Sequence, residues 1–471
     1  MKLFEAFANI FRVPDLRKRV LFTLAMLGVY RLGAVIPTPG INTQRWQEFF
    51  NSAAGSIFGF FDMFAGGNVR KLTIFALGIM PYITASIILQ LLTVVVPTLE
   101  KLQKEGELGR RKITQWTRYL TIILSVIQSA TIGRGLMAMG QGIVIDPGMG
   151  FTLLTIISLT TGTAFIMWLG EQMSERGVGN GMSLIIFAGI VVGLPRAIGS
   201  IYTNVFVTRE WSALELVGLI AMMIAVVAFI VLVERGERRI PVQYAKRVVG
   251  RRVMGGQSTH MPLKVNAGGV IPVIFASSIL AFPTTLLSVP WVKTVRPLFN
   301  MLDSIKHGEP MYYVLFVTGI IFFCFFYVSI IFNPNEAADN MRKYGGFVPG
   351  IRPGKNTADY MNAILTKITV VGGIYLSILC LIPDIMISGI KLQHLPLIGQ
   401  WVDNTFTAIH FRYLLDGMGV QFYFGGTSLL IVVGVAMDTI NQVEAQLIMR
   451  HYEGFTPRSG RIRGRRSSFG S

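Results

Sequence analysis

Long apolar stretches without charged residues recur along the chain, and short segments that carry the charges separate them. A helix needs about 20 predominantly apolar residues to cross a bilayer, so each long stretch is a candidate span. Cutting the sequence at its charges leaves nine stretches, which are residues 72–99, 119–133, 147–170, 177–195, 216–233, 265–292, 311–335, 368–383 and 417–437. The pattern therefore predicts an all-α protein that crosses a membrane many times.

A tenth apolar stretch, residues 20–37, is interrupted only by Arg31 and follows a basic segment. A basic segment before an apolar run is also typical of a signal peptide. Here, however, the apolar run continues past Arg31, and no small-residue cleavage pattern ends it before Pro37. We therefore expect an uncleaved first span. Ten spans place both ends of the chain on the same side of the membrane.

Composition and charge agree with this prediction. The chain is 52% hydrophobic and only 14% charged, whereas soluble domains are about 25% charged. This composition excludes an ordinary soluble enzyme. The net charge is +18, and most Lys and Arg residues fall on one side of the membrane if residues 1–19 are cytoplasmic. The positive-inside rule then predicts that both termini lie in the cytoplasm.

A short apolar segment lies within residues 57–71, between the first two predicted spans, and contains Gly66 and Gly67 near its end. It is too short to cross the membrane. One interpretation is a loop at the membrane interface. The other is a re-entrant segment, which is tolerated at membrane depth only where protein or a water-filled cavity surrounds it. The residues alone leave both interpretations open.

The sequence offers no constellation typical of catalysis or of metal binding. No histidine pair has a metalloprotease spacing, and Cys324 and Cys380 lie in apolar runs, as packing residues do. We therefore expect no enzymatic activity, no metal and no cofactor. An ion-coupled secondary transporter of a small solute would keep ionisable groups at membrane depth, and only Arg31 approaches such a position. That transporter is the weaker alternative.

Two predicted cytoplasmic loops, residues 234–266 and 333–367, are rich in Arg and Lys. One interpretation is that their charge sets the orientation of the spans and attracts anionic lipid. Their length, about 30 residues each, exceeds what orientation requires. Clustered Arg also suits phosphate or carboxylate partners, such as ribosomal RNA or an acidic protein surface.

A set of motifs runs in order along the chain. They are residues 74–83 (IFALGIMPYI), 109–112 (GRRK), 168–172 with 175–177 (WLGEQ, ERG), 333–340 (NPNEAADN), 347–354 (FVPGIRPG) and 424–431 (FGGTSLLI). Read together, they resemble the SecY family of protein-translocase channel subunits. The resemblance extends from about residue 14 to about residue 450.

The resemblance implies a channel of ten helices in two inverted, pseudo-symmetric five-helix halves, with a re-entrant plug helix at about residues 57–70. The halves would be residues 1–205 and 206–450, followed by a basic cytoplasmic tail, 451–471. Residues 384–416 are longer than the usual link between the last two spans, and neither this insertion nor the Arg-rich tail has an assigned role.

The resemblance also implies what the channel does and with what it assembles. The family moves unfolded polypeptides across the bacterial plasma membrane, and it releases apolar segments into lipid through a lateral gate. The implied partners are the small subunits SecE and SecG, the SecA motor ATPase, the ribosome, signal peptides, unfolded polypeptides and anionic lipids. No cofactor is implied.

Functional positions can be carried over from the family by motif. The implied constriction of the pore is a ring of apolar side chains, which are Ile79, Ile83, Met182, Ile186, Ile274 and Ile431. Ile79 and Ile83 are four residues apart, so they lie on one helix face. Bulky apolar side chains that converge on a narrow pore keep water and ions out of it. Met182 stands where the family more often has isoleucine, and we expect the seal to stay apolar but softer.

Three further groups of residues follow from the same resemblance. The implied plug residues are Asp62, Met63, Phe64, Gly66 and Gly67. The implied polar positions of the lateral gate are Gln90 and Asn266. The implied contacts with a cytoplasmic partner are Arg251, Arg252 and Arg352.

Overall fold

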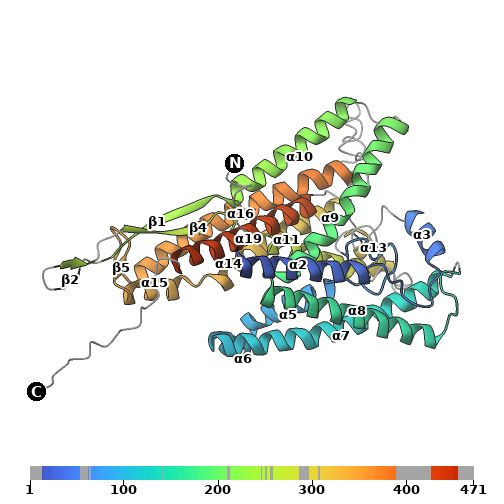
Figure 1. Cartoon of the computed structure of the whole chain (residues 1–471), viewed down its shortest axis with the longest axis horizontal. Coiled ribbons are helices and arrows are strands. Elements are labelled where there is room, and N and C mark those ends of the chain that lie inside the picture. Colours follow the sequence, from blue (N-terminus) through green and yellow to red (C-terminus); the bar gives the residue numbers. More distant parts are fainter. Residues whose placement is uncertain are drawn as a thin grey trace, which may run out of the picture.

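The protein is mostly helical, and its helices lie side by side along the long axis of the molecule (Figure 1). The computed structural model describes residues 13–52, 62, 65–140, 142–208, 213–244, 247–249, 252–254, 258–285, 296–305, 308–388 and 426–453. Strands β1 and β4 project from one end of the helix bundle, and the short helices α3 and α13 lie at the other end.

The helices of the N-terminal part are α2 (Pro14–Gly33), α3 (Thr43–Ser52), α5 (Met80–Val95), α6 (Pro97–Lys104), α7 (Glu107–Met139), α8 (Met149–Arg176) and α9 (Gly181–Tyr202), which continues into the π-helical turn η1 (Thr203–Val207). Those of the C-terminal part are α10 (Ala213–Glu234), α11 (Ile271–Thr285), α13 (Arg296–Asp303), α14 (Pro310–Ile331), α15 (Pro334–Lys343), α16 (Lys355–Ser388) and α19 (Gly426–Glu453). Every one of the ten predicted spans overlaps one of these helices.

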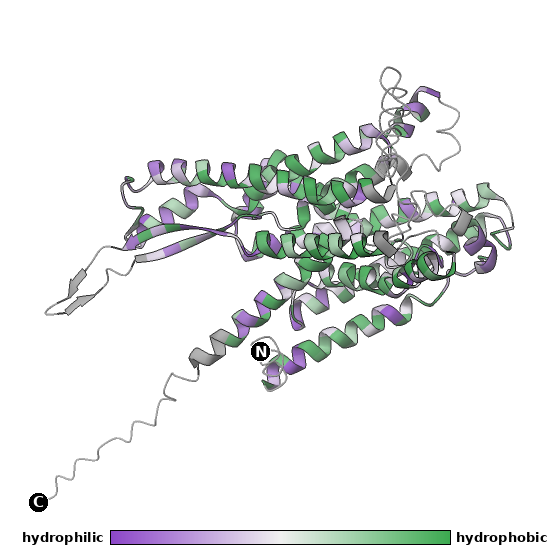
Figure 2. Ribbon diagram, turned by 90° about the horizontal axis from the view of Figure 1, so that it is seen from above, coloured by the Kyte–Doolittle hydropathy of each residue, from purple (hydrophilic) through white to green (hydrophobic). Residues whose placement is uncertain are grey.

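Seven helical segments of the described chain are long and apolar enough to cross a membrane, and α5 with α6 makes an eighth if the bent pair is one span. The two remaining predicted spans correspond to α2, which carries Arg31, and to α11, a shorter apolar helix. Hydrophobic residues fill the middle of the bundle, and hydrophilic residues gather toward its ends (Figure 2). The prediction of an all-α protein with many spans is confirmed.

The second predicted span, residues 72–99, differs from a single straight helix. Its first eight residues form turns, and α5 begins only at Met80. At the other end Val96 is extended, α6 starts at Pro97, and the two helices meet at an angle of 104°. Proline has no N–H to continue the helical hydrogen bonds, and it disfavours a helical conformation in the preceding residue. These two effects explain the bend.

A small sheet, which the sequence did not predict, joins the two basic loops. Strand β1 (Glu237–Tyr244) pairs antiparallel with β4 (Ser258–Lys264) on one side and with β5 (Gly346–Phe347) on the other. Between β1 and β4, strands β2 (Arg247–Val249) and β3 (Arg252–Met254) form a separate antiparallel pair. Since β5 belongs to the second loop, both loops form one structural unit.

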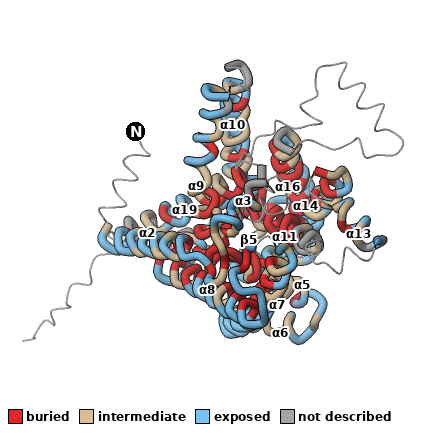
Figure 3. The backbone as a smooth tube through the Cα atoms, turned by 90° about the vertical axis from the view of Figure 1, so that its right-hand side faces the viewer, coloured by how far each residue is buried: buried red, intermediate tan, exposed pale blue. Residues whose placement is uncertain are grey.

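The largest hydrophobic core lies where the helices meet, and the outer faces of the helices are exposed (Figure 3). Large apolar side chains such as Leu24, Val217 and Phe322 are more than half exposed on these outer faces. Such faces suit contact with lipid, because lipid tails are themselves apolar.

Helix α7 presents a stripe of small buried residues to its neighbours α5 and α8. The members of this small-residue stripe are spaced four apart, and they are Thr117, Thr121, Ser125, Ser129 and Gly133. Their hydroxyl groups donate to carbonyl oxygens of α7 itself at 2.6–2.9 Å. The stripe therefore lets the helices approach closely without leaving a buried hydroxyl unpaired.

Gly162 of α8 provides a test of a second close approach, between α8 and the turns that precede α5. A Cβ atom at Gly162 would collide with the backbone of Ile74, whereas a Cβ atom at Gly150 of the same helix would meet open space. We expect Gly162→Ala to lower the free energy of unfolding by about 1–3 kcal/mol, the usual cost of overpacking. Gly150→Ala, the matched control, should be neutral or slightly stabilising. Thermal unfolding in detergent measures both, and equal midpoints for the two variants would contradict the packing described.

Candidate functional site

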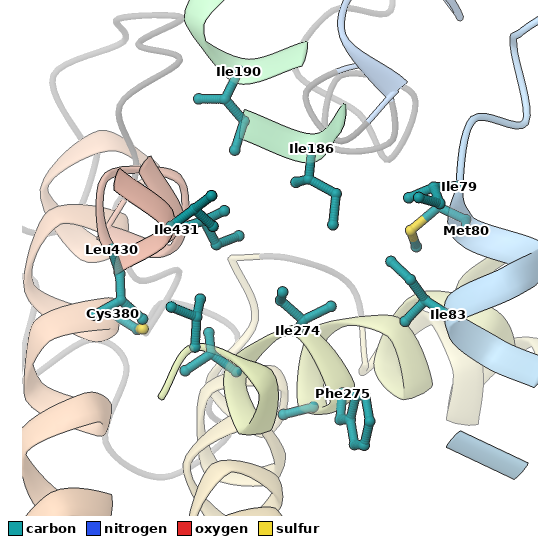
Figure 4. Packing of buried hydrophobic residues seen from close by; sticks show 14 of the residues in the cluster. Ile79, Met80, Ile83, Ile186, Ile190, Ile274, Phe275, Cys380, Leu430 and Ile431 are labelled. Atoms are coloured by element: carbon teal, nitrogen blue, oxygen red, sulfur yellow. The ribbon is translucent and has the colours of Figure 1, made fainter. Parts of the chain in front are cut away.

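Apolar side chains from four helices converge at the centre of the bundle (Figure 4). Ile83 comes from α5, Ile186 from α9, Ile274 from α11 and Ile431 from α19, and all four are at most 8% exposed. Ile79, at the residue before α5, is buried in the same cluster. Five of the six residues predicted for the ring are thus brought together.

The sixth predicted residue, Met182, lies at the edge of this cluster. Its side chain is partly buried and its sulfur contacts Gly170 of α8. Ile190, one turn after Ile186, is buried in the cluster and was missed by the sequence analysis. Its spacing of four from Ile186 is the signal that identifies it.

Local sequence features set the direction in which these isoleucines point. The side chain of Asn180 caps α9 by accepting hydrogen bonds from the N–H groups of Met182 and Ser183 at 3.1 and 3.5 Å. This cap fixes where α9 begins and therefore where Ile186 points. On α5, Pro81 lies in the first turn, where its missing N–H is not needed.

The end of the predicted plug segment is held by a buried polar network. The Tyr30 hydroxyl donates to the Ala65 carbonyl at 3.3 Å, and the Asn68 amide donates to the Tyr30 oxygen at 3.2 Å. The indole N–H of Trp46, in α3, donates to the Val69 carbonyl at 2.9 Å. Helices α2 and α3 thus anchor residues 65–69. Sequence analysis assigned no role in this region to Tyr30, Trp46 or Asn68.

Of the predicted plug residues, Asp62, Gly66 and Gly67 are described, and Met63 and Phe64 lie outside the described residues. Gly66 and Gly67 both have a left-handed backbone, with φ of 71° and 82°. A Cβ atom at Gly66 would also come within 2.7 Å of the Gly189 Cα on α9. Glycine is therefore required at residue 66 both by the turn and by the close approach of two backbones.

Arg31 lies at the end of α2 and is directed toward protein. Its side chain is partly buried, and its Nη1 donates to the Gly66 carbonyl at 3.5 Å. The charged residue that interrupts the first predicted span therefore contacts the plug segment.

The two predicted lateral-gate residues do not bind each other. Gln90 donates to Ser86, one turn away on α5, at 3.2 Å. Asn266 is buried, and its amide donates to Glu234 Oε1 at 2.6 Å and to the Gly269 carbonyl at 3.1 Å. Glu234 ends α10, so Asn266 links α10 to the start of α11. Helices α5 and α11 are nevertheless neighbours, so the two predicted residues belong to adjacent helices or their flanks.

Two of the three predicted docking arginines, Arg252 and Arg352, lie at the end of the bundle that carries the sheet. Arg352 is exposed just before α16, and its carbonyl accepts a hydrogen bond from Thr357 at 2.9 Å. Arg252 lies in β3, and Arg251 lies outside the described residues. Across the described ranges, no group of three or more His, Cys, Asp or Glu side chains is placed to hold a metal ion.

Comparison with known proteins identifies the family. The sequence profile of the SecY family matches residues 73–440. The chain belongs to the SecY family. Relatives include the protein translocase subunit SecY of Escherichia coli K12, 48% identical over 447 residues and covering 93% of each chain. SecY of Streptomyces galbus is 45% identical over 467 residues, covering 96% of this chain and all of the relative.

Solved structures have the same fold at low sequence identity. A protein-conducting channel gives a TM-score of 0.59 at 18% identity, covering 94% of this chain and 95% of the other. Sec61 in a canine ribosome–channel complex gives 0.56 at 17% identity with the same coverage. The multi-pass membrane architecture and the family predicted from the motifs are both confirmed, and ten helices are consistent with SecY. No similarity supports the solute-transporter alternative.

The contact between Asn266 and Glu234 is open to test. We expect Asn266→Leu to lower the free energy of unfolding by about 1–3 kcal/mol, because the partly buried carboxylate of Glu234 loses a hydrogen bond. Asn362→Leu, at an exposed position of α16, is the matched control and should change stability little. Thermal unfolding of the purified variants measures this difference. A midpoint for Asn266→Leu equal to that of the control would show that the contact contributes nothing.

Proposed function

We propose that this SecY-family chain is the conducting subunit of a protein translocase, which passes unfolded polypeptides across a membrane and releases apolar segments into it. The observation that carries the proposal is the convergence of isoleucines from α5, α9, α11 and α19 at the centre of the bundle. The curated relatives are named protein translocase subunits, in agreement with this function.

The proposed pore ring consists of Ile79, Ile83, Met182, Ile186, Ile274 and Ile431, and Ile190 extends it by one turn. A narrow apolar constriction excludes ions because water leaves it. Apolar contacts have no fixed direction, so the same side chains yield to a passing polypeptide without breaking hydrogen bonds. A single ring can therefore seal the resting channel and fit tightly around many different sequences.

The proposed seam lies between two halves, residues 1–205 and 206–450. Helix α5 of the first half contacts α11 of the second, and α9 contacts α19. Separation of α5 from α11 would open a path to lipid near the gate residues Gln90 and Asn266. The plug, with Asp62, Met63, Phe64, Gly66 and Gly67, would close the resting pore. One structural relative bears a plug domain that stabilises the closed state of its translocation channel.

The proposed partners dock on the sheet that unites the two basic loops. The ribosome or the SecA motor would contact Arg251, Arg252 and Arg352. Clustered arginines suit the phosphates of ribosomal RNA or the carboxylates of an acidic protein surface. SecE and SecG are the proposed small membrane subunits, and anionic lipids would contact the basic tail. The proposed location is the bacterial inner membrane with both termini cytoplasmic, following the distribution of Lys and Arg.

Single-channel conductance in a planar bilayer tests the proposed function. We expect the wild-type chain to be silent at rest and a variant that lacks residues 57–70 to pass ions in brief openings, because the pore has lost its stopper. If both stay silent while a small solute accumulates against its gradient, the chain is a transporter and the channel proposal fails.

A second experiment tests the ring itself. We expect Ile186→Ser to raise the resting ion conductance, since a hydroxyl group lets water wet the constriction. Ile198→Ser is the matched control, because Ile198 is on the same helix but is 63% exposed on its outer face. The measurement is again conductance of the reconstituted protein. Equal leaks from the two variants would place the seal elsewhere.

A further inference from the structure

A charged cavity lies between the end of α2, the plug segment and α9. Its lining includes four charged side chains, which are Arg31, Asp62, Lys71 and Arg196. The glycines of the plug end and of α9 bring the two backbones into contact beside it. Neither the seal nor the docking surface explains why charges are gathered here.

Asp62 is the feature of this cavity that requires a counter-ion. Its side chain is fully buried, at 0% exposure. One carboxylate oxygen, Oδ1, accepts a hydrogen bond from the Arg70 N–H at 2.8 Å. The other, Oδ2, is buried and has no hydrogen-bond partner among the described residues. A buried carboxylate is costly unless positive charge compensates it.

Positive charge approaches the Asp62 carboxylate from both sides of the interface between plug and wall, and it partly offsets the cost of burial. Arg70 and Arg196 both act electrostatically on the Asp62 carboxylate. Arg70 belongs to the same segment as Asp62, so its attraction to Asp62 does not anchor that segment to α2 or α9. Arg196 belongs to α9, and its guanidinium lies beside Gly67. Arg31 reaches the same place from α2 and donates to Gly66.

We propose that Asp62 is a latch residue whose charge, attracted by Arg196 of the channel wall, holds the plug in its closed position. The proposal rests on the proposed function, since it requires that this segment is a plug. Displacement of the plug separates the carboxylate from Arg196, and this electrostatic work opposes opening. The latch acts in addition to the apolar ring, because Asp62 and Arg196 are not members of that ring, although α9 carries residues of both.

The test uses the full-length chain together with the subunits that co-purify with it, reconstituted in planar bilayers. Asp62→Asn removes the charge but keeps an oxygen that can accept from the Arg70 N–H, so the turn is preserved. We expect Asp62→Asn and Arg196→Gln each to raise the resting open probability roughly tenfold, because each change removes the attraction between the Asp62 carboxylate and Arg196. The double variant should leak no more than either single variant. Arg196→Lys, which keeps the charge, should stay close to wild type.

Arg134→Gln, at an exposed arginine of α7, is the matched control and should not leak. Additive effects of Asp62→Asn and Arg196→Gln, or no effect of either, would overturn the latch.

Hydrogen exchange gives a second measurement. Amides of residues 65–72 should exchange faster in both single variants than in Arg134→Gln, and equal rates would also overturn the latch. If the deletion of residues 57–70 leaks while the charge variants stay silent, only the latch fails. If that deletion is itself silent, the plug and the proposed function fail together.

Discussion

The structure depends on one constraint: its centre must be apolar and held together without directional bonds. The isoleucines that meet there come from α5, α9, α11 and α19, and no single helix provides the contact alone. Their positions are set from a distance, by the Asn180 cap on α9 and by Pro81 in the first turn of α5. The bend at Val96 turns α6 away from the direction of α5. Each of these local features directs a side chain or a helix, and the side chains that meet at the centre are apolar.

Polar contacts surround this centre and act between elements. Tyr30 and Asn68 bind the end of the plug segment, Asn266 binds Glu234 at the base of the sheet, and Lys264 of β4 approaches Asp438 of α19 at 3.8 Å. Such contacts prefer one arrangement because each donor needs its acceptor. Apolar burial thus provides a seal that adapts, while the polar contacts favour particular positions of the plug and of the sheet.

The spans, the basic loops and most of the central isoleucines could be predicted from sequence, since each depends on hydrophobicity or on a motif. The partners of single polar residues could not. The gate positions Gln90 and Asn266 stay a prediction, and the hydrogen bond from Asn266 to Glu234 could not be predicted, because it depends on where α10 ends relative to the chain before α11. Nothing in the residues beside Tyr30 or Trp46 indicates that their side chains bind carbonyl groups of residues 65–69, which come close only when the chain folds back. Strand β5 is two residues long, too short for an alternating pattern to reveal.

The small-residue stripe of α7 has a consequence for how the molecule can move. Because its hydroxyl groups are satisfied within their own helix, nothing in the stripe specifies a partner, and the stripe holds α7 against α5 and α8 by close fit. An ion pair between Arg118 of α7 and Glu171 of α8, at 2.7 Å, adds to this contact. Close fit along several turns resists tilting of one helix against the next, so we expect α5, α7 and α8 to move together as one rigid unit. Helix α5 contacts α7 on one side and α11 on the other. We therefore expect relative motion of the helices to occur between α5 and α11, and not between α5 and α7.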